Sequence, residues 1–242
     1  MAIPRLGFWR RLAVSIVLPV LKVWTSKTWR GADNLPADGG VILVANHASH
    51  FDPMVISYFL YDNGRWPRFL AKASLWKVPL FGPFLTKVKQ IPVERGSVEA
   101  VKSLDSLVDA LNDGGTVVIY PEGTTSKEPD LWPMRGKTGA ARLALTTGAP
   151  IIPLANWGAY QIYDSRTKKI GLKPRRPVAA IAGPPIDLGK WQGQEPTRQV
   201  LEEITEHIML TIRDQLGEIR EGTPPPLFQP TGRAKTPPEV AG

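Results

Sequence analysis

The sequence predicts an α/β fold in which helices flank a single mixed, mostly parallel sheet. Two observations predict it. From residue 41 onward, short runs rich in Val and Ile alternate with segments of helical periodicity, and the strand-like runs are mostly apolar on both faces, as buried strands are. The 242 residues, 43% of them hydrophobic, suffice for one α/β domain with an appendage.

The expected elements follow from these patterns in chain order. Strands are expected at residues 41–45, 68–72, 88–93, 116–120, 150–154 and 178–182, and helices at 54–61, 97–112, 137–147 and 197–217. Gly114-Gly115 and Gly148 stand where helices would end before a strand. We therefore expect the α/β domain to occupy residues 31–220 and the Pro-rich segment 221–242 to be a disordered tail.

The first thirty residues mix aromatic and basic side chains and hold no acidic residue. Their apolar run, Leu12 to Leu21, is broken by Pro19 and is too short to cross a bilayer. Trp and Arg beside such a run favour amphipathic helices that anchor residues 1–30 in the headgroup layer of a membrane. Two alternatives stay open. One is an amphipathic helix that packs on its own domain; the other is a secretory signal peptide, although no small-x-small cleavage site follows.

Charge and residue usage exclude several classes of function. The formal net charge is +8, and the basic excess lies in the first thirty residues and in residues 166–176, which hold no acidic residue. Such clusters indicate an anionic membrane surface or anionic substrates. No recognised nucleic-acid-binding motif accompanies them, so we expect no nucleic acid partner. With no cysteine and three histidines, we expect neither a thiol nucleophile nor a metal site.

The segment Val44 to Pro53, "VANHASHFDP", places polar residues directly after a predicted strand. His47 is a candidate general base, and Asp52 can orient it by accepting a hydrogen bond from its other ring nitrogen. Within one helix the two side chains would point about 140° apart, so they can meet only at a strand-to-helix junction, which this is. The alternative is purely structural: Asp52 before Pro53 is a good helix N-cap, and Ser49 with Asp52 can form a capping box.

A second polar cluster, Pro121-Glu122-Gly123-Thr124, follows the predicted strand 116–120. Ligands of α/β sheets collect at the carboxyl ends of strands, so this cluster and His47 are expected to face one cleft. Gly123 would permit a tight turn. The chain has neither a Gly-x-Ser-x-Gly motif nor a cysteine, so the base would activate a hydroxyl of the substrate itself.

With its motifs taken in order, the chain resembles the glycerolipid acyltransferases, most closely those acting on 1-acylglycerol-3-phosphate. The family's first block is His-x-x-x-x-Asp, matched by His47 and Asp52, and its third reads Phe-Pro-Glu-Gly-Thr-Arg-Ser, matched from Tyr120 to Ser126. Between them "IPVERGS" supplies Arg95, and "APIIPLA" with Pro153 matches the fourth block. The resemblance covers roughly residues 25 to 215, and position 125 is Thr where the family usually has Arg.

The resemblance implies a glycerol-3-phosphate acyltransferase-like fold and transfer of a fatty acyl group from acyl-coenzyme A or acyl carrier protein to lysophosphatidic acid, which gives phosphatidic acid. The acyl thioester is a substrate, and no cofactor is implied. His47 and Asp52 would be catalytic. The residues expected to bind substrate are Asn46, Arg95, Glu122, Gly123 and Thr124, with Arg135 and Lys137 as substitutes for the missing Arg at 125.

The same resemblance leads us to expect peripheral, monotopic attachment to the cytoplasmic face of the cell membrane. The basic residues 166–176 would suit an anionic acyl carrier. Two alternatives to this function stay open. One is the same chemistry on glycerol-3-phosphate, a glycolipid or another lysolipid; the other is a non-catalytic lipid-binding protein on this fold.

Overall fold

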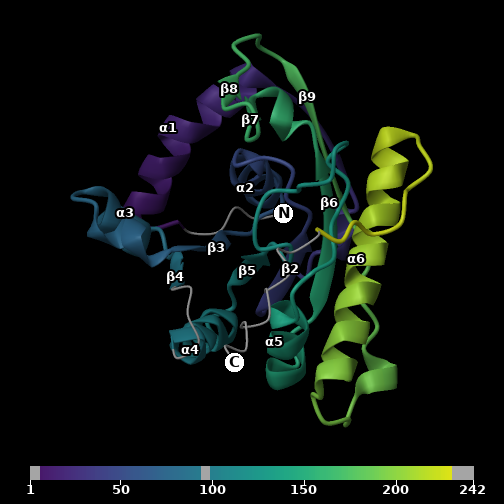
Figure 1. Cartoon of the computed structure of the whole chain (residues 1–242). Helices are drawn as coiled ribbons and strands as arrows, with labels where there is room; N and C mark the ends of the chain where they lie inside the picture. The colour runs from purple at the N-terminus through teal and green to yellow at the C-terminus, as the bar shows by residue number, and fades with distance from the viewer. Residues whose placement is uncertain (1–5, 94–98, 231–242) are drawn as a thin grey trace, which may run out of the picture.

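The computed structural model describes residues 6–93 and 99–230, and its centre is one seven-stranded sheet (Figure 1). Its strand order is β1-β9-β6-β2-β5-β3-β4. The strands are β1 Thr25–Arg30, β2 Val41–Ala45, β3 Pro67–Lys72, β4 Ile91–Val93, β5 Thr116–Ile119, β6 Ile151–Trp157 and β9 Arg176–Ala182. All neighbours pair in parallel except β6 and β9, which are antiparallel. The predicted mixed, mostly parallel sheet is confirmed.

Both faces of the sheet are covered, because its central strands are apolar on both sides. Along β2, Val41 and Leu43 pack with α2, whereas Ile42 and Val44 pack with α4, α5 and α6 on the other face. The helices are α2 Asp52–Asp62, α4 Glu99–Asn112, α5 Gly139–Thr147 and α6 Arg198–Arg220. The smaller elements within the described residues are the helix α3 Phe81–Lys87 and a hairpin of β7 Tyr163–Asp164 and β8 Lys169–Ile170. They also include 3₁₀ helices at Ala32–Asn34, η2 Ala73–Lys77, Ala159–Gln161 and Gly189–Trp191.

The predicted strands form within a few residues of the expected ends, but β1, α3, the β7–β8 hairpin and the 3₁₀ helices were not predicted. β1 is polar, with the sequence TSKTWR, and pairs only with β9 at the edge of the sheet. The boundary predicted between residues 30 and 31 therefore falls after the first strand of the sheet. The expected strand 88–93 begins only at Ile91, since Val88 caps the end of α3.

The N-terminal segment is one helix, α1 Phe8–Trp24, which continues through Pro19. Its outward row is exposed: Phe8, Trp9, Leu12, Ile16, Val20 and Val23. Its other face turns to the domain, where Leu21 is the one buried side chain of this fully described helix. Among the described residues, no helix combines the length and apolar character that a bilayer crossing requires.

The segment after α6 differs from the tail that we expected. Residues 221–230 lie against the domain: Phe228 bridges to Met134, and the N–H of Arg135 donates to the carbonyl of Phe228 at 2.9 Å. Residues 221–230 are therefore not disordered, which corrects the prediction for this part. The rest of the expected tail lies outside the described residues.

Candidate active site

The site begins where β2 ends, and a pair of buried asparagines fixes that end. Asn46 follows the last residue of β2, and Asn156 lies in β6. The Asn46 amide donates to the carbonyl of Asn156 at 3.0 Å and accepts its N–H at 2.8 Å, and the Asn156 amide donates to the carbonyl of Asn46 at 2.8 Å. Both side chains are buried. Asn46 thus ties two strands together, which corrects the substrate-binding role that we expected of it.

His47 and Asp52 meet as the junction predicted. The Nδ1 of His47 lies 2.9 Å from Oδ2 of Asp52, which also accepts the N–H of Ser49 at 2.8 Å. Asp52 is fully buried, while the side chain of His47 keeps 12% exposure. Because the carboxylate requires a donor, we assign the proton to Nδ1, which leaves the lone pair of Nε2 free for a substrate.

The competing interpretation, that Asp52 only caps a helix, is not what the geometry favours. Phe51 occupies the N-cap position of α2 and caps no N–H with its side chain, and Asp52 is already the first helical residue. The half of a capping box that forms, from the N–H of Ser49 to Asp52, shares its acceptor oxygen with His47. Burial raises the pKa of Asp52, and the hydrogen bonds from His47 and Ser49 oppose that rise by favouring the carboxylate.

Glu122 connects two loops of the site by accepting a backbone N–H from each. Its Oε1 accepts the N–H of His47 at 2.7 Å, and its Oε2 accepts the N–H of Met134 at 3.1 Å. The side chain is 5% exposed, and burial raises its pKa to about 8. With both oxygens bonded to backbone, Glu122 holds the two loops together, which corrects the expectation that it contacts the acceptor.

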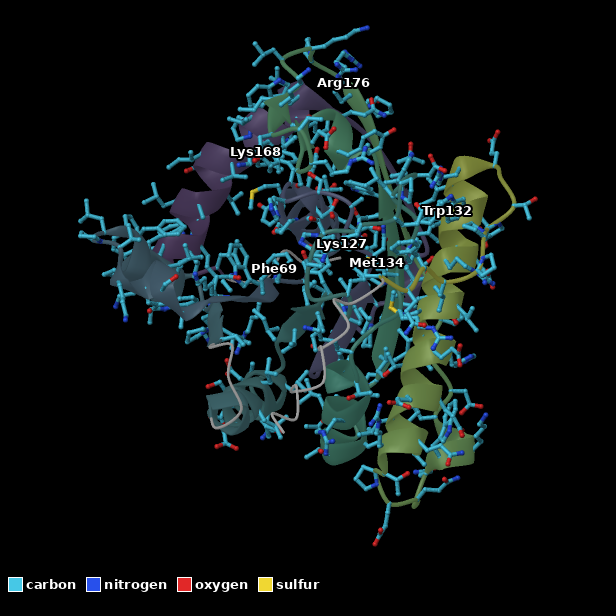
Figure 2. All side chains as sticks on the ribbon, viewed as in Figure 1. Phe69, Lys127, Trp132, Met134, Lys168 and Arg176 are labelled. Atoms are coloured by element: carbon cyan, nitrogen blue, oxygen red, sulfur yellow. The ribbon has the colours of Figure 1, made fainter. Side chains whose placement is uncertain are left out.

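The remainder of the second motif joins the same two loops. The N–H of Ser126 donates to the carbonyl of His47 at 2.7 Å, and its hydroxyl donates to the carbonyl of Trp132. Trp132 lies against α6 (Figure 2), where the guanidinium of Arg220 sits 4.1 Å from its ring centroid and 4.4 Å from that of Trp157. The predicted meeting of the two motifs at one end of the sheet is confirmed.

Gly123 makes the predicted turn, with φ of 69° and its N–H donating to the carbonyl of Tyr120 at 3.0 Å. A Cβ on Gly123 would stand 2.9 Å from Nζ of Lys137, so a glycine lets this ammonium lie directly over the turn. Thr124 and Lys137 are exposed beside it. These three residues form the open, polar side of the site.

Of the other two predicted cations, only Arg135 lies within the described residues, and it is directed toward α6. The guanidinium of Arg135 lies 4.0 Å from the carboxylate of Glu206 on α6, so its expected role in replacing the Arg missing at position 125 is not supported. Arg95 lies outside the described residues. Lys137 is therefore the described cation that stands at the motif.

An aromatic ring supports the histidine, and sequence reasoning did not anticipate this role. Tyr120 stacks on the imidazole of His47 with centroids 4.1 Å apart, and Phe69 stacks on Tyr120 with centroids 6.3 Å apart. The hydroxyl of Tyr120 is buried and has no hydrogen-bond partner among the described residues, and burial raises its pKa well above its ordinary value. The stack limits rotation of the imidazole.

A cavity of about 420 Å³ lies beside His47 and is largely apolar. Its walls come from α1, α2, β3 and α3, and include Val14, Val17, Met54, Phe69, Phe84 and Leu85. Pro67 of β3 pairs with Thr116 of β5, and Tyr120, just after the end of β5, lies four residues beyond Thr116, roughly 13 Å at 3.3 Å per residue. The cavity therefore extends from the histidine toward the opposite end of the strands. The sequence did not predict that α1 forms a wall of this cavity.

Comparisons with known proteins bear on this site. The acyltransferase family model matches residues 27–157, which include His47, Asp52, Glu122 and Lys137. The chain is 29% identical over 143 residues to a chloroplastic 1-acyl-sn-glycerol-3-phosphate acyltransferase of Brassica napus, covering 58% of this chain and 40% of that protein. It is 27% identical over 183 residues to the 1-acyl-sn-glycerol-3-phosphate acyltransferase of Bacillus subtilis (strain 168), covering 75% and 84%.

A solved structure has a similar fold. It is the 1-acyl-sn-glycerophosphate (LPA) acyltransferase PlsC of Thermotoga maritima, with a TM-score of 0.60 and 22% identity over 90% of this chain and 79% of that one. A further relative, from Borreliella burgdorferi, is 30% identical and is also named 1-acyl-sn-glycerol-3-phosphate acyltransferase. The matched regions span 40% and 48% of the Brassica and Borreliella proteins, so this chain corresponds to less than half of their length.

Proposed function

The chain belongs to the acyltransferase family, and from this premise we propose that it transfers a fatty acyl group from a thioester to the free hydroxyl of 1-acylglycerol-3-phosphate, giving phosphatidic acid. The observation that carries the proposal is the contact of His47 with Asp52 beside an apolar cavity. A base next to a chain-sized apolar cavity suits acyl transfer between lipids. The names of the relatives support the acceptor.

In the proposed reaction the acceptor hydroxyl gives its proton to Nε2 of His47 while its oxygen attacks the thioester carbonyl. The resulting tetrahedral centre expels the thiolate as the carbon–sulfur bond breaks, and the imidazolium returns the proton to that sulfur. Asp52 stabilises the imidazolium during this step through the 2.9 Å contact. General-base help of this kind contributes about 10²–10⁴-fold in rate. No covalent acyl-enzyme forms.

The acyl chain of the donor would lie in the cavity between α1, α2, β3 and α3. Each buried methylene adds about 0.8 kcal/mol to binding. Because the walls are side chains of fixed elements, the length of the cavity would set the preferred chain. Either acyl-coenzyme A or acyl carrier protein would present this chain.

The acceptor phosphate would lie over the turn at Gly123. There the ammonium of Lys137 stands where the family's Arg at position 125 is replaced by Thr. Lysine binds phosphate as a point charge, in contrast to the bidentate fork of arginine. Thr124 adds a hydroxyl on the same side. Arg95 keeps its proposed role as a second phosphate ligand.

The outward row of α1, from Phe8 to Val23, would lie in the headgroup layer of an anionic membrane. We propose peripheral attachment at the cytoplasmic face, where the acceptor lipid is available without leaving the bilayer. The helix would then be both the anchor and one wall of the cavity.

The test is acyl transfer from palmitoyl-coenzyme A to 1-acylglycerol-3-phosphate by purified protein, beside His47→Ala and the neighbouring control His50→Ala. We expect activity that is lost in His47→Ala and retained in His50→Ala. Transfer to a glycolipid or to glycerol-3-phosphate instead would keep the chemistry and replace the acceptor, as the Thr at position 125 allows. No transfer to any acceptor, with binding of lipid retained, would favour the non-catalytic alternative.

A further inference from the structure

We propose that the β7–β8 hairpin and its return to β9 are a second membrane-binding element that docks on an anionic bilayer beside the catalytic loop. We call residues 163–175 the basic hairpin. The proposal rests on the proposed function in one respect: the acceptor lipid must be taken from a membrane.

The basic hairpin has the composition of an interfacial element. Ile170 and Leu172 are 61% and 76% exposed, although both are large and apolar. No acidic residue occurs from 165 to 176, and four cations are exposed around the two apolar side chains: Lys168, Lys169, Lys173 and Arg175. Apolar side chains surrounded by cations insert at the headgroup boundary of anionic bilayers.

Backbone conformation shows that two of these cations are held at a conformational cost. Lys168 and Arg175 adopt φ of 57° and 54°, in the left-handed region that glycine fills without strain. Strained positions that keep a specific side chain are characteristic of functional surfaces. At both positions a charged residue stands where a glycine would adopt the same backbone conformation without strain.

The basic hairpin is continuous with the exposed face of α1. The N–H of Arg175 donates to the carbonyl of Val23 at 3.2 Å, and the indole of Trp24 donates to the carbonyl of Leu172 at 3.4 Å. Figure 1 shows β8 and the start of β9 beside the C-terminal end of α1, with α3 at its other end. Exposed apolar residues occur at all three places, with Leu80 of the α3 N-cap 89% and Val23 of α1 66% exposed. A bilayer is the partner that covers such an extended face.

The base of the basic hairpin contacts the catalytic loop. The hydroxyl of Ser49 donates to the carbonyl of Tyr163 at 2.5 Å, and the N–H of His50 donates to the hydroxyl of Ser165 at 2.8 Å. His47, two residues before Ser49, lines the cavity. Docking of the hairpin tip would therefore hold the catalytic loop at the membrane surface, where the acceptor phosphate is.

An acyl carrier, the other partner suggested by the charges of residues 166–176, accounts for less of what is observed. Arg166 is already engaged, since it donates to the carbonyl of Pro129 and lies 3.6 Å from the carboxylate of Asp164. The exposed Ile170 and Leu172 have no role in binding an anionic carrier by charge.

The experiment is co-sedimentation of full-length protein with vesicles of phosphatidylcholine alone or with about one third phosphatidylserine. The test variants are Lys168→Gly/Arg175→Gly, which removes two charges while relieving backbone strain, and Ile170→Ser/Leu172→Ser. The control is Arg142→Gln/Arg198→Gln, which removes two exposed charges on α5 and α6. Thermal melting checks that each variant is folded.

At low salt we expect the glycine pair to weaken binding to anionic vesicles by about 25-fold, roughly fivefold per charge, with little change on neutral vesicles. The serine pair should weaken binding about tenfold to both the anionic and the neutral vesicles. The control should change binding less than twofold. Test variants that bind like the control would overturn the proposal.

A second measurement distinguishes binding of the acyl carrier by the basic hairpin from binding of the membrane. KM for palmitoyl-coenzyme A is measured in detergent micelles for the glycine pair and the wild type. If KM rises in the glycine pair while its vesicle binding is unchanged, the basic hairpin binds the acyl carrier, and the proposal is overturned. Because vesicle binding requires no turnover, its result does not depend on whether the proposed acyl transfer is found.

Discussion

Replacing Asp52 by Asn tests how much the negative charge beside His47 contributes to catalysis, because the substitution keeps the geometry of the contact. Oδ2 accepts both hydrogen bonds, from His47 and Ser49, while Oδ1 is buried with no partner among the described residues. The amide oxygen of Asn can take the place of Oδ2 and keep both bonds, and its NH₂ occupies the unpartnered position. The fold and the His47 tautomer are therefore retained, and only the negative charge is lost.

The size of the effect follows from that charge. Two unit charges about 4 Å apart attract by about 4 kcal/mol at an effective dielectric constant of about 20. Since Asp52 is fully buried beside His47, the imidazolium formed during transfer loses about this much stabilisation. We expect kcat to fall about 10³-fold in Asp52→Asn, with KM for both substrates little changed.

The assay follows the thiol released from palmitoyl-coenzyme A, and a chain without cysteine adds no background thiol. Asp62→Asn is the matched control, because Asp62 is the last residue of the same helix and binds Lys27 and Trp29 instead. A loss below tenfold at unchanged Tm would refute the assignment of Asp52. His47→Ala sets the floor of the measurement.

Three further predictions concern Glu122 and Asn46, which hold the loops of the site, and Ala13, which lines the cavity. In Glu122→Gln one of two backbone N–H donors loses its acceptor, so the free energy of unfolding should fall by about 1–3 kcal/mol. Burial raises the pKa of Glu122 from 4.5 to about 8, so the folded chain keeps a proton that the unfolded chain releases between those values. Stability of the wild type should therefore fall as pH rises through that interval, and chemical denaturation from pH 5 to 8 should find this slope missing in the variant. Asn46→Ala should lower Tm and leave KM unchanged, because it removes the hydrogen-bond partners of two buried backbone groups of Asn156. A changed KM at constant Tm would instead show that Asn46 binds substrate. Ala13→Phe, at the cavity wall on α1, should shift preference to shorter acyl donors, with about fourfold lower kcat/KM per excluded methylene; an unchanged chain profile would place the acyl group elsewhere.

The parts predicted well from the sequence are those with local signals. β2 and β5 are apolar on both faces and therefore recognisable, and the His47–Asp52 contact follows from a separation of five residues across a strand-to-helix junction. β1 was missed because an edge strand with one neighbour needs no apolar face, and TSKTWR has none. The catalytic role of His47 and Asp52 stays a prediction.

The roles of Asn46 and Glu122 were not predictable in the same way. Their residue types suggested ligand contact, yet their partners lie 110 and 75 residues away in the chain, and only the fold brings them together. Lys137 and Arg135 differ by two positions on irregular backbone, so no periodic signal predicts that Lys137 lies at Gly123 and Arg135 at Glu206. Tyr120 occupies the place of the Phe in the family's third block, and only the fold shows that its ring stacks on His47.

The bonds around His47 have a consequence for how the protein loses activity on heating. Its N–H is bound to Glu122, its carbonyl to Ser126, and the preceding residue to Asn156 in β6. Releasing the histidine thus requires opening the two loops and separating β2 from β6, which is most of global unfolding. Thermal inactivation should coincide with the cooperative melting transition, and the amides of His47 and Ser126 should exchange with solvent as slowly as those at the centre of the sheet.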